Sequence, residues 1–362
     1  MKVYLIGFAN RLNAQYDWVR EVNEIKSINP DKIFCIGMEE GYPADWFDNS
    51  LFDKLIDWLE EHKKFVHVIG GFRQSVYGKF TPRIQQRILH EEALGCIFWC
   101  DARQYDIERE SYELYKTPKL FTCYNNNHKI ERALLVDELC KHNLMDDGVL
   151  TLHNPNLYQH NDGSPYVWKY HNGTCLTDEP DFKLNEYGAI NIPKSFKQGF
   201  FDVITESFCG PEEFLISEKT LKSIGMAKPF ITLSCKGYHA YLRDKLGILL
   251  YDEMFDYSFD QCDKIEDRIE GIVNNIIRLK DILSSEEEKY KMYKTIQSKL
   301  HTNLATRQAI VWDKDVVIPK SLHFLFDDNS CILYGQKRTP VIEQINEMLN
   351  KQGSKLKWAD EL

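Results

Sequence analysis

The chain has 362 residues, of which 43% are apolar and 13% aromatic, and its formal net charge is −10. This length suits two domains, and the apolar content excludes a chain that is disordered throughout. The negative charge argues against nucleic-acid binding through phosphate neutralisation by the chain as a whole. No apolar run approaches the roughly 18 residues that cross a membrane. Residues 1–10 have a strand pattern and lack the basic start of a signal peptide, so we expect a cytoplasmic protein with mostly reduced cysteines.

Residues 1–115 alternate between short apolar runs and amphipathic helical patterns. This alternation predicts a layered α/β domain. The predicted strands are Val3–Phe8, Lys32–Gly37, Phe65–Ile69 and Ile97–Trp99, and the predicted helices are Leu51–Lys63 and Pro82–Ala93. A helix at residues 340–352 begins with a proline, and we expect it to complete this first domain.

Residues 116–339 predict a second α/β domain, interrupted by an irregular insertion at 143–200 that is rich in polar and aromatic residues. An insertion of this length is more often functional than inert. The predicted strands are Lys119–Cys123, Phe200–Thr205, Phe230–Leu233 and Ile248–Tyr251. The predicted helices are His128–His142, Ser217–Ile224, His239–Leu246, Asp263–Leu283 and Glu286–Leu300.

The start of the helix at Ser217 has the residues of an anion site. Ser217 is a good N-cap, so free backbone N–H groups point outward there, and Lys219 and Lys222 add positive charge. Glu218 in the same turn could accept hydrogen bonds from the two hydroxyls of a ribose. Together they suit a sugar nucleotide better than bare phosphate. The alternative is a solvated helix start with Glu and Lys on its surface.

The segment that begins at Ser217 reads SEKTLKSIGMAKPFITLSCKGYHAYLRDKLGILLYDEMFDYSFD. It resembles predicted glycosyltransferases encoded by tailed phages and large DNA viruses and, more distantly, the donor-binding segment of α-1,3-fucosyltransferases. The resemblance implies the GT-B fold, with two Rossmann-like domains facing across a cleft and the nucleotide sugar held mainly by the C-terminal one. It also implies that Glu218 contacts the ribose, that Lys219 contacts the phosphates, and that Lys222 is the second lysine of the motif. Ser217 and Ser223 depart from the family's usual Thr and Pro.

A second stretch, FTCYNNNHKIERALLVDEL, resembles the opening of the C-terminal domain in the same families. It offers Asn125 as a hydrogen-bond donor and Arg132 as a fork for diphosphate oxygens. The alternative for Arg132 is a surface salt bridge with Glu131 or Asp137. The predicted donor-binding set is completed by Glu206, which follows a strand, and by Gly237, which lies in the glycine loop.

The first domain should then bind the acceptor and supply any catalytic base. Glu39, Glu40 and His67 are candidate bases, and Arg73 is a candidate acceptor contact, because they lie near predicted strand ends. Each of them taken alone is also explained by an ordinary structural or surface role.

The resulting expectation is a glycosyltransferase that moves a sugar from a nucleoside-diphosphate sugar to an acceptor hydroxyl, by default on a glycan. It would need no cofactor or metal and would act in the host cytoplasm if it is virus-encoded. A hydroxymethylated DNA base is a second candidate acceptor. A non-catalytic nucleotide-sugar-binding protein and a virion interaction protein are competing hypotheses for the function. The absence of GxxxxGK[ST], GxGxxG and GxSxG argues against P-loop ATPases, common dinucleotide enzymes and α/β-hydrolases.

Overall fold

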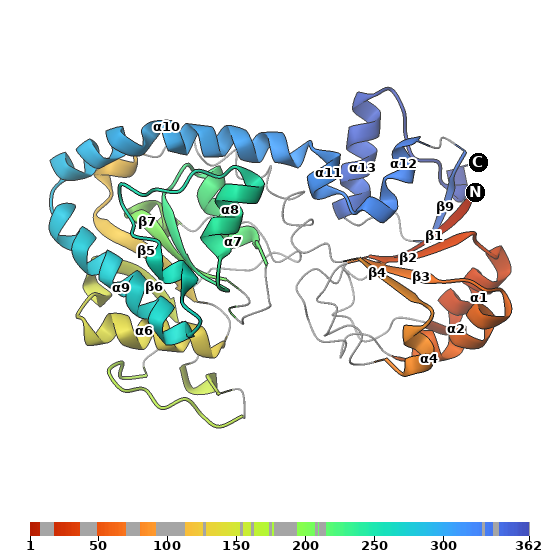
Figure 1. Cartoon of the computed structure of the whole chain (residues 1–362), viewed down its shortest axis with the longest axis horizontal. Coiled ribbons are helices and arrows are strands. Elements are labelled where there is room, and N and C mark those ends of the chain that lie inside the picture. The colour runs from red at the N-terminus through yellow and green to blue at the C-terminus, as the bar shows by residue number, and fades with distance from the viewer. Residues whose placement is uncertain are drawn as a thin grey trace. The chain divides into compact units, whose positions relative to one another are not determined.

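The chain forms two compact units, each built on its own parallel sheet (Figure 1). The computed structural model describes residues 1–7, 18–36, 49–69, 80–91, 113–125, 128–152, 155–160, 163–173, 176, 194–206, 209, 215–327, 330–335 and 340–361. The first unit contains Met1–Asp101 and Val311–Leu362, and the second contains Ala102–Ile310. The protein is therefore an α/β protein with two Rossmann-like domains, as in the GT-B fold.

The sheet of the first unit has five strands in the order β4-β3-β2-β1-β9, all parallel. The strands are β1 (Lys2–Gly7), β2 (Lys32–Ile36), β3 (Val66–Ile69), β4 (Ile88–Glu91) and β9 (Ile332–Gly335). The helices of this unit are α1 (Trp18–Ile28), α2 (Asn49–Glu61), α4 (Pro82–Gln85), α11 (Lys314–Val317), α12 (Phe324–Asp327) and α13 (Pro340–Lys351).

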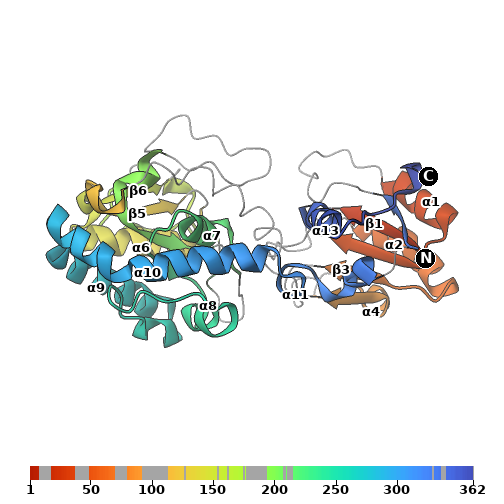
Figure 2. The ribbon, with the colours of Figure 1, turned by 90° about the horizontal axis from the view of Figure 1, so that it is seen from above.

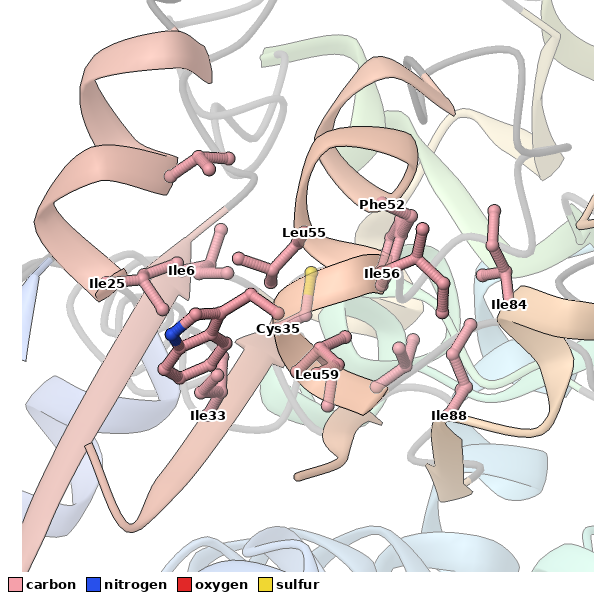
Figure 3. Packing of buried hydrophobic residues seen from close by; sticks show 14 of the residues in the cluster. Ile6, Ile25, Ile33, Cys35, Phe52, Leu55, Ile56, Leu59, Ile84 and Ile88 are labelled. Carbon is pink, nitrogen blue, oxygen red and sulfur yellow. The ribbon is translucent and has the colours of Figure 1, made fainter. Parts of the chain in front are cut away.

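Alternation along the strands gives the first unit its core. Ile33 and Cys35 point from β2 toward α1 and α2, where Ile25 and Leu55 are fully buried (Figure 3). Phe34 points to the opposite face, where its ring stacks on Phe324 of α12. Both faces of the sheet are therefore covered, as expected for parallel strands with near-continuous apolar sequence.

Two predictions for the first unit are wrong. The predicted helix Pro82–Ala93 is only the short helix α4, followed by the edge strand β4. The predicted second domain ran to residue 339, but β9 pairs with β1 in the first sheet. With four residues, β9 is too short for its pattern to identify a partner that lies more than 300 positions earlier. The predicted strand Ile97–Trp99 lies outside the described residues.

The sheet of the second unit has four parallel strands in the order β6-β5-β7-β8. The strands are β5 (Lys119–Asn125), β6 (Gly148–Leu152), β7 (Gly199–Thr205) and β8 (Phe230–Leu233). The main helices are α6 (Ile130–Lys141), α7 (Glu218–Gly225), α8 (Tyr238–Leu246), α9 (Ile265–Ile282) and α10 (Glu286–Val311). The longest is α10, with 26 residues, and it runs along the outside of this unit (Figures 1 and 2).

The order of these strands fixes where a ligand site is expected. The chain moves from β5 outward to β6, returns past β5 to β7, and then continues outward to β8. Because parallel crossovers are right-handed, α6 and α7 pack on opposite faces, and their first turns diverge above the ends of β5 and β7. Ligands of open α/β sheets bind at this switch point, beyond the carboxyl ends of the strands.

Two predictions for the second unit are also wrong. The insertion predicted at 143–200 contains β6, an edge strand of the sheet. Ile248–Tyr251 is not a strand, because a side chain takes the place of a neighbouring strand. The Asn303 amide of α10 donates to the Leu249 carbonyl at 2.9 Å and accepts from the Leu249 N–H at 2.7 Å. These two hydrogen bonds satisfy an extended backbone without any sheet.

Candidate functional site

The ends of β5 and β7 are tied together by Asn125. Its Oδ1 accepts a hydrogen bond from Thr205 Oγ1 at 3.0 Å, and its Nδ2 donates to Cys123 Sγ at 3.2 Å. Its backbone N–H donates to Thr151 Oγ1 of β6 at 2.9 Å. Because Asn125 is fully buried, these contacts make it a residue that holds three strand ends in register. It supports the site from below rather than presenting its amide to a ligand.

Glu206, the next residue after β7, organises the start of α7. Its Oε1 accepts hydrogen bonds from the Ser217 N–H at 3.1 Å, Thr220 Oγ1 at 2.8 Å and Tyr238 OH at 3.1 Å. Its Oε2 accepts from Ser217 Oγ. Glu206 and Ser217 are both buried. The sequence predicted that both residues bind the donor. Because their polar atoms already have protein partners, we interpret them as residues that position the start of α7.

The first turn of α7 presents an ion pair of adjacent residues. Ser217 Oγ accepts from the Lys219 N–H at 3.3 Å, which is the N-cap contact that the sequence predicts. Lys219 Nζ lies 2.9 Å from Glu218 Oε1, and the two side chains are 21% and 22% exposed. Burial raises the pKa of Glu218, but the Lys219 ammonium and the backbone N–H of the helix start outweigh it and hold this pKa below its ordinary value. The charged and partly accessible pair of Glu218 and Lys219 therefore occupies the first turn of α7, which we call the tip.

Positive charges from α6 and α7 converge above the ends of the strands. Burial lowers the pKa of Lys129, and the charges of Arg132 and Lys219 lower it further, while the Glu131 carboxylate opposes them. Lys129 precedes the first turn of α6 and Arg132 lies within that turn, so the starts of the two helices bring three cations within electrostatic reach. Cations that repel one another in this way favour an anion between them.

The side chain of Arg132 does not lie at the surface, as a surface salt bridge with Glu131 or Asp137 would require. Its side chain is buried, with 1% of the residue exposed. The Asp137 carboxylate instead accepts backbone hydrogen bonds from Lys169, Tyr170 and His171 at 2.8–2.9 Å. Arg132 thus contributes charge from beneath the site, while Asp137 anchors the insertion.

Lys222 lies one turn further along α7. Its ammonium lies 4.8 Å from the centroid of the Phe196 ring and 5.3 Å from that of Tyr124. Burial lowers the pKa of Lys222, which Asp202 and Glu218 partly restore. The predicted motif lysine is therefore half-buried and rests on aromatic faces, an arrangement that keeps its charge near the strand ends.

The sequence did not single out Lys228, which is fully buried between α7 and β8. Its Nζ donates to Thr122 Oγ1 and to the Phe196 carbonyl, both at 2.7 Å. Burial lowers its pKa to about 7, against the raising effect of Asp202. Asp202 in turn accepts from Thr122 Oγ1 at 2.8 Å and from Ser223 Oγ at 2.6 Å. A lysine after a helix carries no signal of such burial, because Asp202 and Thr122 lie far away in sequence.

At the start of α8, the backbone N–H groups donate to Asp260 of the same chain. Gly237 has φ of 79° and donates its N–H to the Asp260 carbonyl at 2.8 Å. The Asp260 carboxylate accepts from the backbone N–H groups of His239 and Ala240 and from His239 Nδ1, at 2.8–3.2 Å. His239 Nε2 then accepts from the Thr232 N–H at 3.1 Å. Gly237 is needed for its left-handed backbone, and its N–H has no capacity left for a ligand.

The candidates in the first unit are less well defined. Glu39, Glu40 and Arg73 lie outside the described residues. His67 lies within β3 rather than beyond its end, and its ring stacks on Phe34 with centroids 4.7 Å apart. Burial and the nearby Lys32 lower the pKa of His67. A neutral imidazole in mid-strand is not where a sheet of this kind places its catalytic groups.

The insertion contains an aromatic cluster. Its sequence indicates only that the segment is rich in aromatic residues, and not that they pack together. Tyr158, Tyr166 and Trp168 pack edge to face, with centroids 5.0–5.8 Å apart, against Ala133 and Val136 of α6. The cluster belongs to the segment that follows β6, and it packs along the face of α6.

The described residues contain no group of three or more His, Cys, Asp and Glu side chains that could hold a metal ion. None of the helices in the described ranges is long and apolar enough to cross a membrane. No family model matches the chain, and no curated protein or solved structure is similar enough to match it. The two parallel sheets therefore define the fold, and the function is inferred from the site.

Proposed function

We propose that the protein is a glycosyltransferase whose second unit binds a nucleoside-diphosphate sugar at the ends of β5 and β7. The observation that carries the proposal is the partly accessible Lys219 in the first turn of α7, together with Lys129 and Arg132 at the start of α6. These cations stand at the topological switch point of the sheet, where open α/β folds bind nucleotides. A diphosphate is the ligand whose charge they would neutralise.

Each side chain of the tip has a chemical role in this proposal. Lys219 and Lys222 would stabilise the diphosphate as it leaves the sugar, together with the positive end of the α7 dipole. Glu218, kept ionised by Lys219, would accept hydrogen bonds from the ribose hydroxyls. The lysines would stabilise the leaving group without a bound metal.

The acceptor is proposed to be a hydroxyl of a glycan, bound by the first unit. The catalytic base is left between Glu39 and Glu40, because His67 lies in mid-strand, and Arg73 stays the candidate acceptor contact. A hydroxymethylated DNA base stays an alternative acceptor, and non-catalytic binding of a nucleotide sugar stays an alternative function.

A nucleotide screen followed by an activity assay tests the proposal. UDP, GDP, CMP, TDP and ADP are each added to the whole chain, and the melting temperature is measured. A nucleotide at 100 times its Kd should raise the free energy of unfolding by about 2.7 kcal/mol. If none of the five nucleotides shifts the melting temperature, the proposal is wrong.

Release of nucleotide from the corresponding sugar donor then separates the two functions. Slow hydrolysis, accelerated by a glycan, supports a glycosyltransferase, whereas binding without any turnover supports a binding protein. Hydroxymethylated DNA as the better accelerator would favour the DNA alternative.

A further inference from the structure

A pocket of about 420 Å³ opens in the second unit between α10, the end of α7 and the segment that leads into β5. Its volume lies within the roughly 300–1,000 Å³ typical of small-molecule sites. Its lining residues precede β5 and β8 in the chain, so it lies at the amino edge of the sheet. The predicted donor site lies at the carboxyl edge. Because β5 has seven residues, about 20 Å of strand separates the two edges.

The pocket has an apolar floor and aromatic walls. Leu114, Met226 and Leu300 are buried beneath it. Tyr115 meets Tyr290 nearly at a right angle, with ring centroids 5.0 Å apart, and lies 5.7 Å from Tyr293 at a tilt of 42°. Rings set at these angles form the sides of a concave site rather than a flat stack.

One face of α10 supplies most of the polar rim. Tyr290, Tyr293, Lys294, Gln297 and His301 follow helical spacing, so they share this face. Lys294 Nζ donates to Gln297 Oε1 at 3.3 Å, and the Gln297 amide nitrogen makes no hydrogen bond to any residue that the structure describes. The rim therefore combines hydrogen-bond donors and acceptors above an apolar floor.

The ammonium groups around the pocket disfavour a cationic ligand at its aromatic walls. Lys116 Nζ lies 5.8 Å from the centroid of the Tyr115 ring, and Lys294 Nζ lies 5.5 Å from that of Tyr290. Aromatic faces that already carry ammonium groups would repel a second cation. A free anion would meet the Glu113 carboxylate, which is held at the rim by Tyr115 OH at 2.8 Å.

We propose that this pocket binds a neutral saccharide, as a glycan site separate from the predicted donor site. A sugar ring has an apolar C–H face for the tyrosines, and each of its hydroxyls can both donate and accept a hydrogen bond. A rim of carboxylate, amide and ammonium groups serves such hydroxyls in both directions. The site goes beyond the proposed function, because binding there requires neither a nucleotide nor turnover.

Saturation-transfer NMR on the whole chain with maltose, cellobiose, lactose and chitobiose tests this site. We expect at least one disaccharide to bind, and Tyr290→Ala to weaken its binding about tenfold because a stacking face is lost. Tyr290→Phe keeps the ring and should retain binding. Tyr290 is 43% exposed, so neither change should disturb the fold. Tyr241→Ala is the matched control, since this tyrosine of α8 is 40% exposed and lies outside the pocket.

Three outcomes would overturn the proposal. The first is that none of the four disaccharides binds. The second is that Tyr290→Ala and Tyr241→Ala weaken binding equally. The third is that UDP or GDP competes with the disaccharide and displaces it. The last outcome would mean that the sugar occupies the predicted donor site. Binding of adenosine or uridine at the tyrosines in place of the sugars would show that the pocket selects nucleobases, which also contradicts a saccharide site.

Discussion

The starts of α7 and α8 follow neighbouring strands of one sheet, yet they are finished in opposite ways. At α8 the Asp260 carboxylate accepts both early backbone N–H groups and the His239 ring, so the positive end of the helix already has its anion. At α7 the buried Glu206 fixes the N-cap, and Glu218 and Lys219 remain about one-fifth exposed. A helix dipole alone therefore does not define an anion site. What differs is whether the charged groups at the helix start are buried, as Asp260 is, or partly accessible, as Glu218 and Lys219 are.

The largest effect is expected from removing the anion of α8. Asp260→Ala should lower the free energy of unfolding by about 2–4 kcal/mol, because it removes a cap and leaves the buried donors of His239 and the half-buried N–H of Ala240 without an acceptor. Urea unfolding measures this change. The control is Asp263→Ala, since the Asp263 side chain is 86% exposed and its ion pair with Lys236 should contribute less than about 1 kcal/mol.

If Asp260→Ala instead weakens nucleotide binding while stability is unchanged, the nucleotide binds at the start of α8 and not at the start of α7.

The next effect concerns affinity at α7. Lys219→Ala should weaken binding of the preferred nucleoside diphosphate by about 10- to 100-fold, because a charge-assisted hydrogen bond to phosphate is lost. Isothermal titration measures the Kd. Lys141→Ala is the matched control, because Lys141 forms a similar ion pair with Glu138 at the other end of α6. Equal affinities for the two variants would remove Lys219 from the site.

An effect of similar size is expected from the buried lysine beneath α7. The pKa of Lys228 is about 7 in the folded chain and near 10.5 when unfolded. Between these values the unfolded chain binds more protons, so the free energy of unfolding should rise with pH. The slope contributed by Lys228 approaches about 1.4 kcal/mol per pH unit above pH 7. Lys228→Met should remove this contribution between pH 7 and 9, and identical slopes for both proteins would contradict a buried lysine that loses its charge near pH 7.

The smallest effect is expected at the far end of α7. Ala227 has φ of 49°, a left-handed conformation that glycine adopts without strain. Ala227→Gly should raise the free energy of unfolding by up to about 1 kcal/mol. Ala240→Gly within α8 is the matched control and should lower it by a similar amount. A loss of stability in both variants would mean that the strain at Ala227 is compensated by its contacts.

Much of the fold could be predicted from sequence, because apolar runs of strand length and helical stripes survive without tertiary information. The strands β1, β2, β3, β5, β7 and β8 and the helices α2, α6, α7, α8, α9 and α10 were confirmed. The errors occur where a partner distant in sequence decides the structure. Asn303 replaces a strand beside Leu249, and β1 recruits β9 from the opposite end of the chain.

The candidate site shows the same limit. The N-cap at Ser217 and the adjacent Glu218 and Lys219 could be predicted, because capping depends on neighbouring residues. The closure of α8 by Asp260 could not, since 20 or more residues separate the carboxylate from the N–H groups that it accepts. Likewise, Asn125 supports the site through contacts between strands, and Glu206 through contacts with the starts of α7 and α8, and no local pattern reveals either.

Hydrogen–deuterium exchange with the nucleotide that shifts the melting temperature most tests the central claim directly. With the nucleotide bound, amides at residues 129–132 and 218–222 should exchange more slowly. Amides at residues 238–242, where Asp260 already occupies the helix start, should exchange at an unchanged rate. Protection at the start of α8, or protection at neither helix start, would contradict the account.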